Sequence, residues 1–183
     1  MSIETPLIAI LVASDRASRG EYEDLGGPAA EDWLRNVITS PVTYKRKIVS
    51  DGRENVANAL LALADDDKAD LILVTGGTGP APRDETPEAM EDVIDKRLPG
   101  FGESMRLASL KEVPTAILSR QDAGIRGQSL IVTLPGKPAA IDTCLKAVFQ
   151  AVPYCLDLIG AGRIETNPAL CDAFRPKKEA ATG

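Results

Sequence analysis

Short segments rich in aliphatic and β-branched residues recur along the chain and predict buried β-strands. The first of them is a continuous apolar run of the kind found in strands that are covered on both faces. The predicted strands span residues 7–13, 42–49, 71–75, 115–119 and 129–134. The polar stretch between the last two strands allows one antiparallel hairpin.

Apolar residues at helical spacing separate these strands and predict amphipathic helices. The first helix starts at Pro28, and the next two start at residues that can cap a helix, Asp51 and Thr86. Two more helices are predicted over residues 101–111 and from 139 towards 159. Because strands alternate with helices, we expect a three-layer α/β fold in which helices cover both faces of a mostly parallel sheet.

The length and charge of the chain limit the classes of protein to which it can belong. A chain of 183 residues fits a single domain, here assigned to residues 1–174 and followed by a polar C-terminal tail over 175–183. The formal net charge of −6 argues against a nucleic-acid-binding domain, which usually carries a basic surface. No apolar stretch reaches the ~18 residues that span a bilayer, and no basic segment of a signal peptide precedes the first apolar run. A soluble protein of the cytoplasm is therefore expected.

The chain contains no histidine. This excludes Ser-His and Cys-His nucleophile pairs, histidine-ligated zinc, and histidine as a general acid or base. The three cysteines are odd in number and form no CxxC pair, which argues against a disulfide scaffold or a cysteine-rich zinc site. This cysteine usage fits a reducing cytosol.

Two loops leave the carboxyl ends of predicted strands, where open parallel sheets bind their ligands. Glycines in the first loop let the backbone come close to a ligand and turn its N–H groups towards an anion. The second loop leads into a helix N-terminus, which favours phosphate. Neither loop matches the Walker or Rossmann pattern, so either alone could be a structural turn. Their residues are Thr75, Gly76, Gly77, Thr78, Gly79 and Pro80 in the first, and Pro135, Gly136, Lys137 and Pro138 in the second.

Two aspartates lie near the same strand ends. Asp51 follows the second predicted strand, and Asp84 follows the glycine loop. A protein that handles a polyphosphate needs Mg²⁺, which is usually held by one or two carboxylates with substrate oxygens and water. The structural alternatives are a helix cap for Asp51 and a solvated loop acid for Asp84.

Three polar residues, Ser14, Asp15 and Arg16, end the first predicted strand. They are candidates for the same binding site because they lie at a strand end. The alternative is an ordinary exit from strand to loop, since serine and aspartate favour turns.

These motifs resemble the molybdopterin adenylyltransferase family. The resemblance extends from about residue 7 to 176, and five motifs in order at the family's spacing make it specific. The motifs are residues 14–24, 75–89, 99–106, 114–120 and 134–138.

The resemblance implies a homotrimer that transfers AMP from ATP to the terminal phosphate of molybdopterin and releases pyrophosphate. Mg²⁺ would accompany ATP, and a molybdenum insertase would be a partner protein. Asp51 and Asp84 fall on the family's essential acidic positions, and Ser109 and Ser119 fall on positions that line its pterin pocket. The phosphate-holding loops would be residues 76–79 and 135–137.

This chemistry agrees with a chain that lacks histidine. The attacking phosphate oxygen is already an anion at neutral pH and needs no general base. Catalysis would depend on alignment and on charge neutralisation by Mg²⁺, backbone amides and Lys137. Two alternatives stay open: a non-catalytic molybdopterin-binding or assembly protein, and a different nucleotide-dependent enzyme on the same scaffold.

Overall fold

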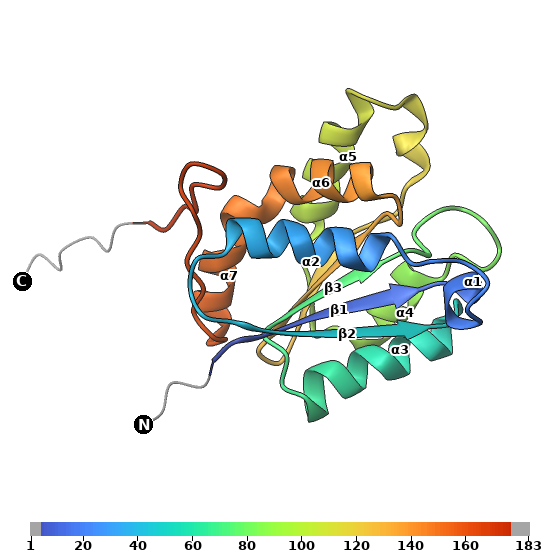
Figure 1. The fold of residues 1–183 in the computed structure, drawn as a ribbon, viewed down its shortest axis with the longest axis horizontal. Helices are drawn as coiled ribbons and strands as arrows, with labels where there is room; N and C mark the ends of the chain where they lie inside the picture. Colours follow the sequence, from blue (N-terminus) through green and yellow to red (C-terminus); the bar gives the residue numbers. More distant parts are fainter. Residues whose placement is uncertain (1–4, 177–183) are drawn as a thin grey trace, which may run out of the picture.

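A six-stranded sheet forms the centre of the protein in a computed structural model that describes residues 5–176 (Figure 1). The strand order is β2-β1-β3-β6-β5-β4. The first four strands in this order pair in parallel, and β6, β5 and β4 pair antiparallel, which confirms the mostly parallel sheet with one hairpin. The strands are β1 Leu7–Ala13, β2 Thr43–Val49, β3 Leu71–Thr75, β4 Lys96–Arg97, β5 Ala123–Arg126 and β6 Ser129–Leu134.

Helices cover both faces of this sheet and confirm the predicted three layers. One face carries α2 (Gly26–Val37), α5 (Pro99–Leu110), α6 (Pro138–Val148) and α7 (Val152–Ile159). The other face carries α3 (Arg53–Leu61) and α4 (Thr86–Val93). Short helical turns complete the chain: α1 Asp15–Ser18, the π-helical turn η1 Ala62–Asp66, and the 3₁₀ turns η2 Pro114–Leu118 and η3 Phe149–Ala151.

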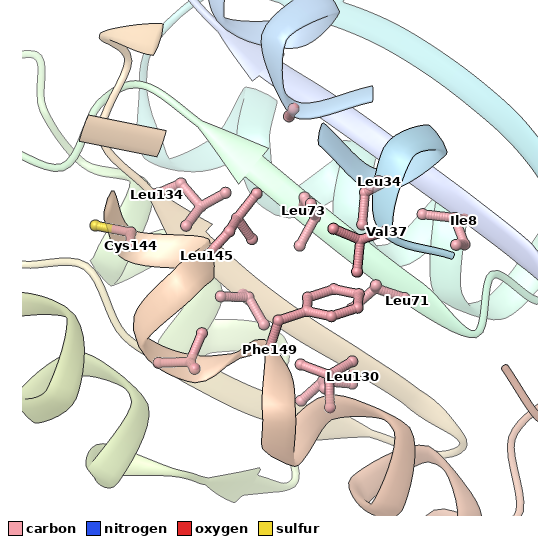
Figure 2. Packing of buried hydrophobic residues seen from close by; sticks show 14 of the residues in the cluster. Ile8, Leu34, Val37, Leu71, Leu73, Leu130, Leu134, Cys144, Leu145 and Phe149 are labelled. Atoms are coloured by element: carbon pink, nitrogen blue, oxygen red, sulfur yellow. The ribbon is translucent and has the colours of Figure 1, made fainter. Parts of the chain in front are cut away.

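The side chains of β1 alternate between two cores. Ile8 and Ile10 belong to the core beneath α2 and α6, whereas Ala9 and Leu11 belong to the core beneath α3 and α4. This double burial explains why the strand is continuously apolar. Phe149 lies at the centre of the first core (Figure 2). Its ring packs edge to face on Trp33, with 5.0 Å between ring centroids.

The strand predicted over residues 115–119 is wrong. These residues form the 3₁₀ turn η2, which starts at Pro114 and leaves Ile117 71% exposed. The antiparallel partner of β6 is β5, inside the polar stretch that precedes β6. Gly127 has a φ of 53° and starts the two-residue turn between them, a conformation that glycine adopts without strain.

Two predicted helix caps are also wrong. Gly52 precedes α3 and Glu85 precedes α4, and neither position has a capping hydrogen bond from its side chain. Thr86 is instead the first residue of α4, and its hydroxyl donates to the carbonyl of Gly76 at 2.9 Å. Asp51 and Thr86 therefore serve the loops around the strand ends and do not cap helices.

The other boundaries differ in detail. Helix α2 begins at Gly26, two residues before Pro28, and the last predicted helix consists of α6, η3 and α7. In the predicted tail, Arg175 donates to the carboxylate of Asp157 and to the carbonyl of Ile164. Residues 177–183 of that tail lie outside the described residues. Within 5–176, no helix is long and apolar enough to cross a membrane.

Candidate functional site

A cleft of about 540 Å³ lies at the carboxyl ends of β3 and β6. Both predicted ligand loops border it, as the rule for open parallel sheets predicts. Asp84 and Ser119 line it as well, so the fold brings together four of the predicted segments. The lining residues are Gly76, Gly77, Thr78, Gly79, Pro80, Asp84, Thr115, Leu118, Ser119, Pro135, Gly136 and Lys137.

A smaller cavity of about 230 Å³ adjoins this cleft and shares Gly76, Gly136 and Lys137 with it. Ser14 lines the smaller cavity, together with Tyr22 and the start of α2. Lys137 therefore borders both the cleft and the smaller cavity, and it directly precedes Pro138, the first residue of α6. A cation at this position can attract an anion in either one.

The glycine loop needs its glycines for two separate reasons. Gly76 and Gly77 have φ values of 92° and 63°, which other residues rarely adopt. A Cβ at Gly77 would lie 2.3 Å from the Thr86 hydroxyl oxygen and 3.5 Å from Oδ1 of Asp51. A Cβ at Gly79 would lie 2.7 Å from Oδ2 of Asp84. The missing side chains thus leave room for Thr86 at Gly77 and for the Asp84 carboxylate at Gly79, whereas Asp51 lies at an ordinary contact distance.

Each of the two carboxylates is held by one backbone amide. Asp51 Oδ2 accepts a hydrogen bond of 2.8 Å from the N–H of Asp15, and Asp84 Oδ2 accepts one of 3.0 Å from the N–H of Ala81. The second oxygen of each carboxylate makes no hydrogen bond to the residues that the structure describes. Both side chains are therefore oriented, and each keeps one oxygen for a ligand.

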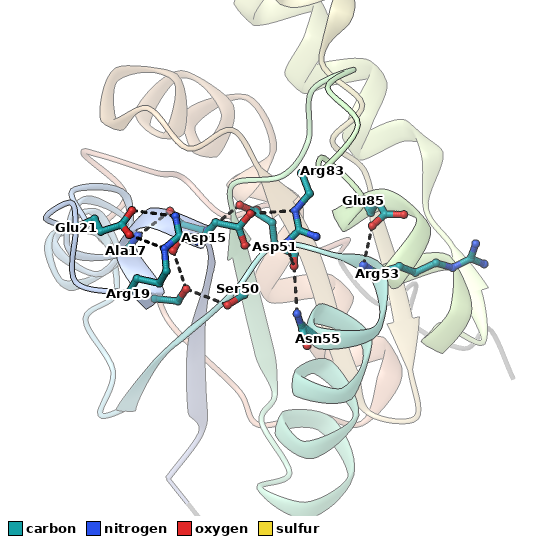
Figure 3. A network of polar contacts seen from close by, with 12 residues as sticks. Asp15, Ala17, Arg19, Glu21, Ser50, Asp51, Arg53, Asn55, Arg83 and Glu85 are labelled. Atoms are coloured by element: carbon teal, nitrogen blue, oxygen red, sulfur yellow. Dashed lines mark hydrogen bonds and ion pairs between the residues drawn. The ribbon is translucent and has the colours of Figure 1, made fainter.

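Arg83 connects the two acidic segments (Figure 3). Its guanidinium forms a bidentate ion pair with Asp15, at 2.9 and 2.7 Å, and donates to the carbonyl of Asp51 at 3.0 Å. The pair is exposed, so we expect it to orient the loops more than to stabilise the fold. The sequence reasoning missed Arg83, although a cation directly before Asp84 in a chain with so many acids is a usable signal.

The segment Ser14-Asp15-Arg16 forms the start of α1. The Ser14 hydroxyl accepts from the N–H of Ala17, so Ser14 caps this turn. The Asp15 carboxylate is occupied by Arg83, and the Arg16 guanidinium lies 4.8 Å from the centre of the Tyr22 ring. Ser14 lines the smaller cavity, whereas Asp15 and Arg16 line neither that cavity nor the cleft.

The two predicted serines are placed differently. Ser119 is half-buried and lines the cleft. Ser109 is buried between α5 and α6, where its hydroxyl lies 3.7 Å from the Cys144 sulfur. The structure therefore brings Ser119 to the glycine loop but not Ser109.

Burial and local charges displace the pKa values of the two neighbouring aspartates in opposite directions. Burial raises the pKa of Asp51, and the negative charges of Asp15 and Asp84 add to this rise. The ion pair with Arg83 lowers the pKa of Asp15. In a titration followed by carboxyl-carbon NMR, we expect Asp51 to protonate at a higher pH than Asp15. The reverse order would contradict this description of the site.

The two carboxylates fit the Mg²⁺ that the family resemblance implies. Asp51 and Asp84 repel each other, and each has an oxygen that is not bonded to the described protein. Within residues 5–176, no group of three or more His, Cys, Asp or Glu residues could hold a metal alone. Mg²⁺ is commonly held by one or two carboxylates with phosphate oxygens and water, so this pair suits a cation that arrives with a polyphosphate.

Comparisons with known proteins find relatives in both sequence and fold. A family model described as "Probable molybdopterin binding domain" matches residues 9–154. The chain is 53% identical over 176 residues to the molybdopterin adenylyltransferase of Helicobacter pylori, covering 96% of this chain and 100% of that protein. It is 44% identical over 187 residues to the enzyme of the same name from Escherichia coli, covering 96% of each. The crystal structure of the molybdopterin biosynthesis enzyme MoaB from Thermus thermophilus superposes with a TM-score of 0.76 at 39% identity, covering 85% of this chain and 96% of that one.

Proposed function

The chain belongs to the family of molybdopterin-binding domains, and on this premise we propose that it transfers AMP from ATP to the terminal phosphate of molybdopterin. Relatives that match 96% of the chain are named molybdopterin adenylyltransferases, so its place is in molybdenum cofactor biosynthesis. The products would be adenylyl-molybdopterin and pyrophosphate. We place the reaction in the cytoplasm, with a molybdenum insertase as the protein that receives the product.

One observation carries the proposal: two oriented carboxylates meet a glycine loop beside a cleft that also holds Lys137. In the proposed step, a phosphate oxygen of molybdopterin forms a bond to the α-phosphorus of ATP. The bond between that phosphorus and the bridging α–β oxygen breaks, and pyrophosphate leaves with the electron pair. No proton has to move, so the lack of histidine is no obstacle.

The residues of the chain have separate roles in this proposal. The loop from Gly76 to Gly79 presents backbone close to the phosphates, and Lys137 supplies positive charge from the opposite loop. Asp51 and Asp84 would hold Mg²⁺, which when bound neutralises the charge of the triphosphate. Because two anions must meet, alignment and charge neutralisation supply the catalysis.

The test is incubation of the purified protein with molybdopterin and Mg-ATP, followed by detection of adenylylated product and pyrophosphate. A reaction without Mg²⁺ is the control. Molybdopterin binding without product would contradict the proposal and favour a non-catalytic binding or assembly protein. Turnover of ATP onto another acceptor would favour a different nucleotide-dependent enzyme.

Replacement of the two predicted serines by leucine is expected to separate binding from folding. Ser119 lines the cleft, so Ser119→Leu should weaken molybdopterin binding and leave Mg-ATP binding nearly intact. Ser109 is packed against Cys144, so Ser109→Leu should overpack the α5–α6 contact and lower stability by about 1–3 kcal/mol. Calorimetric titration with each ligand and denaturant unfolding measure the two effects. Equal loss of both ligands in Ser119→Leu would contradict a pterin contact.

The homotrimer implied by the family resemblance is part of the proposal. Large apolar side chains are exposed on α5, on η2 and on the turn between them, and such a patch suits association between chains. They are Leu107, Leu110, Val113, Ile117 and Leu118. Light scattering at micromolar concentration is expected to give three times the mass of one chain. A clean monomer would contradict the trimer.

A further inference from the structure

Arg120 joins three loops of the site although it does not line the cleft. It follows Ser119, and its backbone N–H donates to the carbonyl of Thr78 at 2.8 Å. Its side chain then extends to Gly79 and Asp84, near the two ends of the segment that carries the Asp84 carboxylate. One half-buried side chain thus connects the glycine loop, the Asp84 turn and the Ser119 segment.

The guanidinium uses each of its three nitrogens. Nε donates to the carbonyl of Gly79 at 3.0 Å, and one terminal nitrogen donates to the carbonyl of Asp84. The other terminal nitrogen pairs with the carboxylate of Glu88 on α4. A planar fork with fixed donor directions can hold these three acceptors at once, whereas a lysine ammonium acts as a point charge.

Glu88 orients this fork. The ion pair with Arg120 lowers the pKa of Glu88, so the carboxylate is ionised at neutral pH. The second oxygen of Glu88 is buried and has no hydrogen-bond partner among the described residues. A buried oxygen without a hydrogen-bond partner costs stability. The ion pair with Arg120 is the contact that accounts for the position of the Glu88 carboxylate.

The segment between these anchors is short and holds Asp84 in place. It runs from Thr78 to Asp84, with the Asp84 N–H donating to the carbonyl of Ala81 and the Asp84 carboxylate accepting from the Ala81 N–H. The hydrogen bonds of this small turn join only its own residues. Its orientation relative to the cleft therefore depends on contacts at the two ends of the segment. Arg120 supplies contacts at Thr78, Gly79 and Asp84, which are the two ends of the segment.

We propose that Arg120 is a positioning residue that fixes the 78–84 segment, and with it the Asp84 carboxylate, in the shape that receives the nucleotide. The functional part of this inference rests on the proposed adenylyl transfer. Arg120 touches carbonyl groups and Glu88, and it acts on the substrate only through the loop. A displacement of about 1 Å at a reacting group can lower a rate on the order of a hundredfold, which is the effect expected here.

The test compares Arg120→Lys with Arg126→Lys. Arg126 is a matched control because its guanidinium also binds one carboxylate, that of Asp65, and one carbonyl, that of Val93, on β5 away from the cleft. In hydrogen exchange without nucleotide, Arg120→Lys should exchange the amides of residues 78–84 faster than wild type and Arg126→Lys should not. With nucleotide, Arg120→Lys should bind Mg-ATP more weakly and turn over on the order of a hundredfold more slowly, at a thermal midpoint close to that of the control.

Each outcome decides the inference. Wild-type exchange in the 78–84 segment of Arg120→Lys would overturn it, and so would faster exchange with unchanged Mg-ATP affinity. Equal losses of Mg-ATP affinity in both lysine variants would also overturn it, since they would show a general loss of stability. If the wild-type protein binds Mg-ATP without adenylylating molybdopterin, the proposed function fails, and exchange and Mg-ATP affinity still decide the role of Arg120.

Discussion

Replacing Asp84 by asparagine is expected to lower the rate of adenylyl transfer on the order of a thousandfold, because a metal-held contact in the transition state is lost. Asparagine keeps the size of the side chain and can still accept from the Ala81 N–H, so the loop should keep its shape. The negative charge is removed, and one carboxylate oxygen becomes an NH₂ group that cannot bind a metal. Molybdopterin is itself an anion, so its binding should survive.

The same substitution at Asp51 has a further signature. The pKa of Asp51 is raised on folding, so the native state binds more protons than the unfolded state between the two pKa values. Stability therefore falls as the pH rises through that window, and the ionised carboxylate destabilises the fold at neutral pH. Asp51→Asn should lose activity like Asp84→Asn and yet unfold at the same or a higher temperature. Wild-type activity in Asp51→Asn would contradict a metal-binding role for Asp51.

The control for both variants is Asp67→Asn. Asp67 is bonded to Lys45 and lies outside the cleft, so its loss should leave turnover unchanged. Adenylylation rate, molybdopterin affinity and thermal midpoint are measured for all three proteins. An Asp84→Asn protein that turns over like wild type would falsify the magnesium assignment.

The central strands could be predicted because both of their faces are buried. Helices cover both faces of β1, β3 and β6, so apolar side chains are favoured at successive positions of these strands. This preference appears in the sequence as continuous apolar runs. Strand β5 escaped prediction because it begins with the small residues Ala123 and Gly124 and ends with the half-buried Ile125 and Arg126, so it contains no apolar run. Its pairing with β6 depends on the turn at Gly127, which apolar patterning does not reveal.

The opposite error at η2 has a related cause. Ala116, Ile117 and Leu118 look like a strand, but Ile117 and Leu118 are exposed, and their apolar character therefore reports no burial in the sheet. Pro114 removes one backbone donor and fixes its own φ, which favours the start of a helical turn. Apolar content alone could not distinguish a buried strand from an exposed turn beside the cleft.

The site could be predicted in part for a geometric reason. Carboxyl ends of parallel strands meet at one edge, so the glycine loop, Lys137 and Asp84 converge there. The positions of Ser109 and Arg120 depend on how α5 and η2 pack, which is tertiary information. A sequence shows that Arg120 is charged, but only the fold shows that its donors reach the glycine loop, the Asp84 turn and helix α4.

A second large effect, a loss of stability, is expected when Gly76 is replaced. This residue has a φ of 92°, and a Cβ there would lie 2.3 Å from the carbonyl oxygen of Ala13, at the end of the neighbouring strand. The obstacle is backbone, so no side-chain rotation can relieve it. Ala13 ends β1, which pairs with β3, and the Gly76 N–H also donates to the carbonyl of Leu134 at 3.2 Å. A shift at Gly76 therefore disturbs strand ends on both sides.

Gly76→Ala should lower the free energy of unfolding by on the order of 3 kcal/mol, from backbone strain together with a contact that only a strand shift can relieve. Gly136→Ala and Gly100→Ala are the controls. A Cβ at Gly136 would lie 3.6 Å from the Cα of Gly76, an ordinary contact, so this loop variant should keep its stability. A Cβ at Gly100 would have no neighbour within 4 Å, and alanine there should be neutral or stabilise α5 by up to about 1 kcal/mol. Denaturant unfolding of the three variants measures these differences. A Gly76→Ala protein as stable as Gly136→Ala would show that the strand ends can yield at this point, and the tight approach between Gly76 and Ala13 would then not constrain the loop.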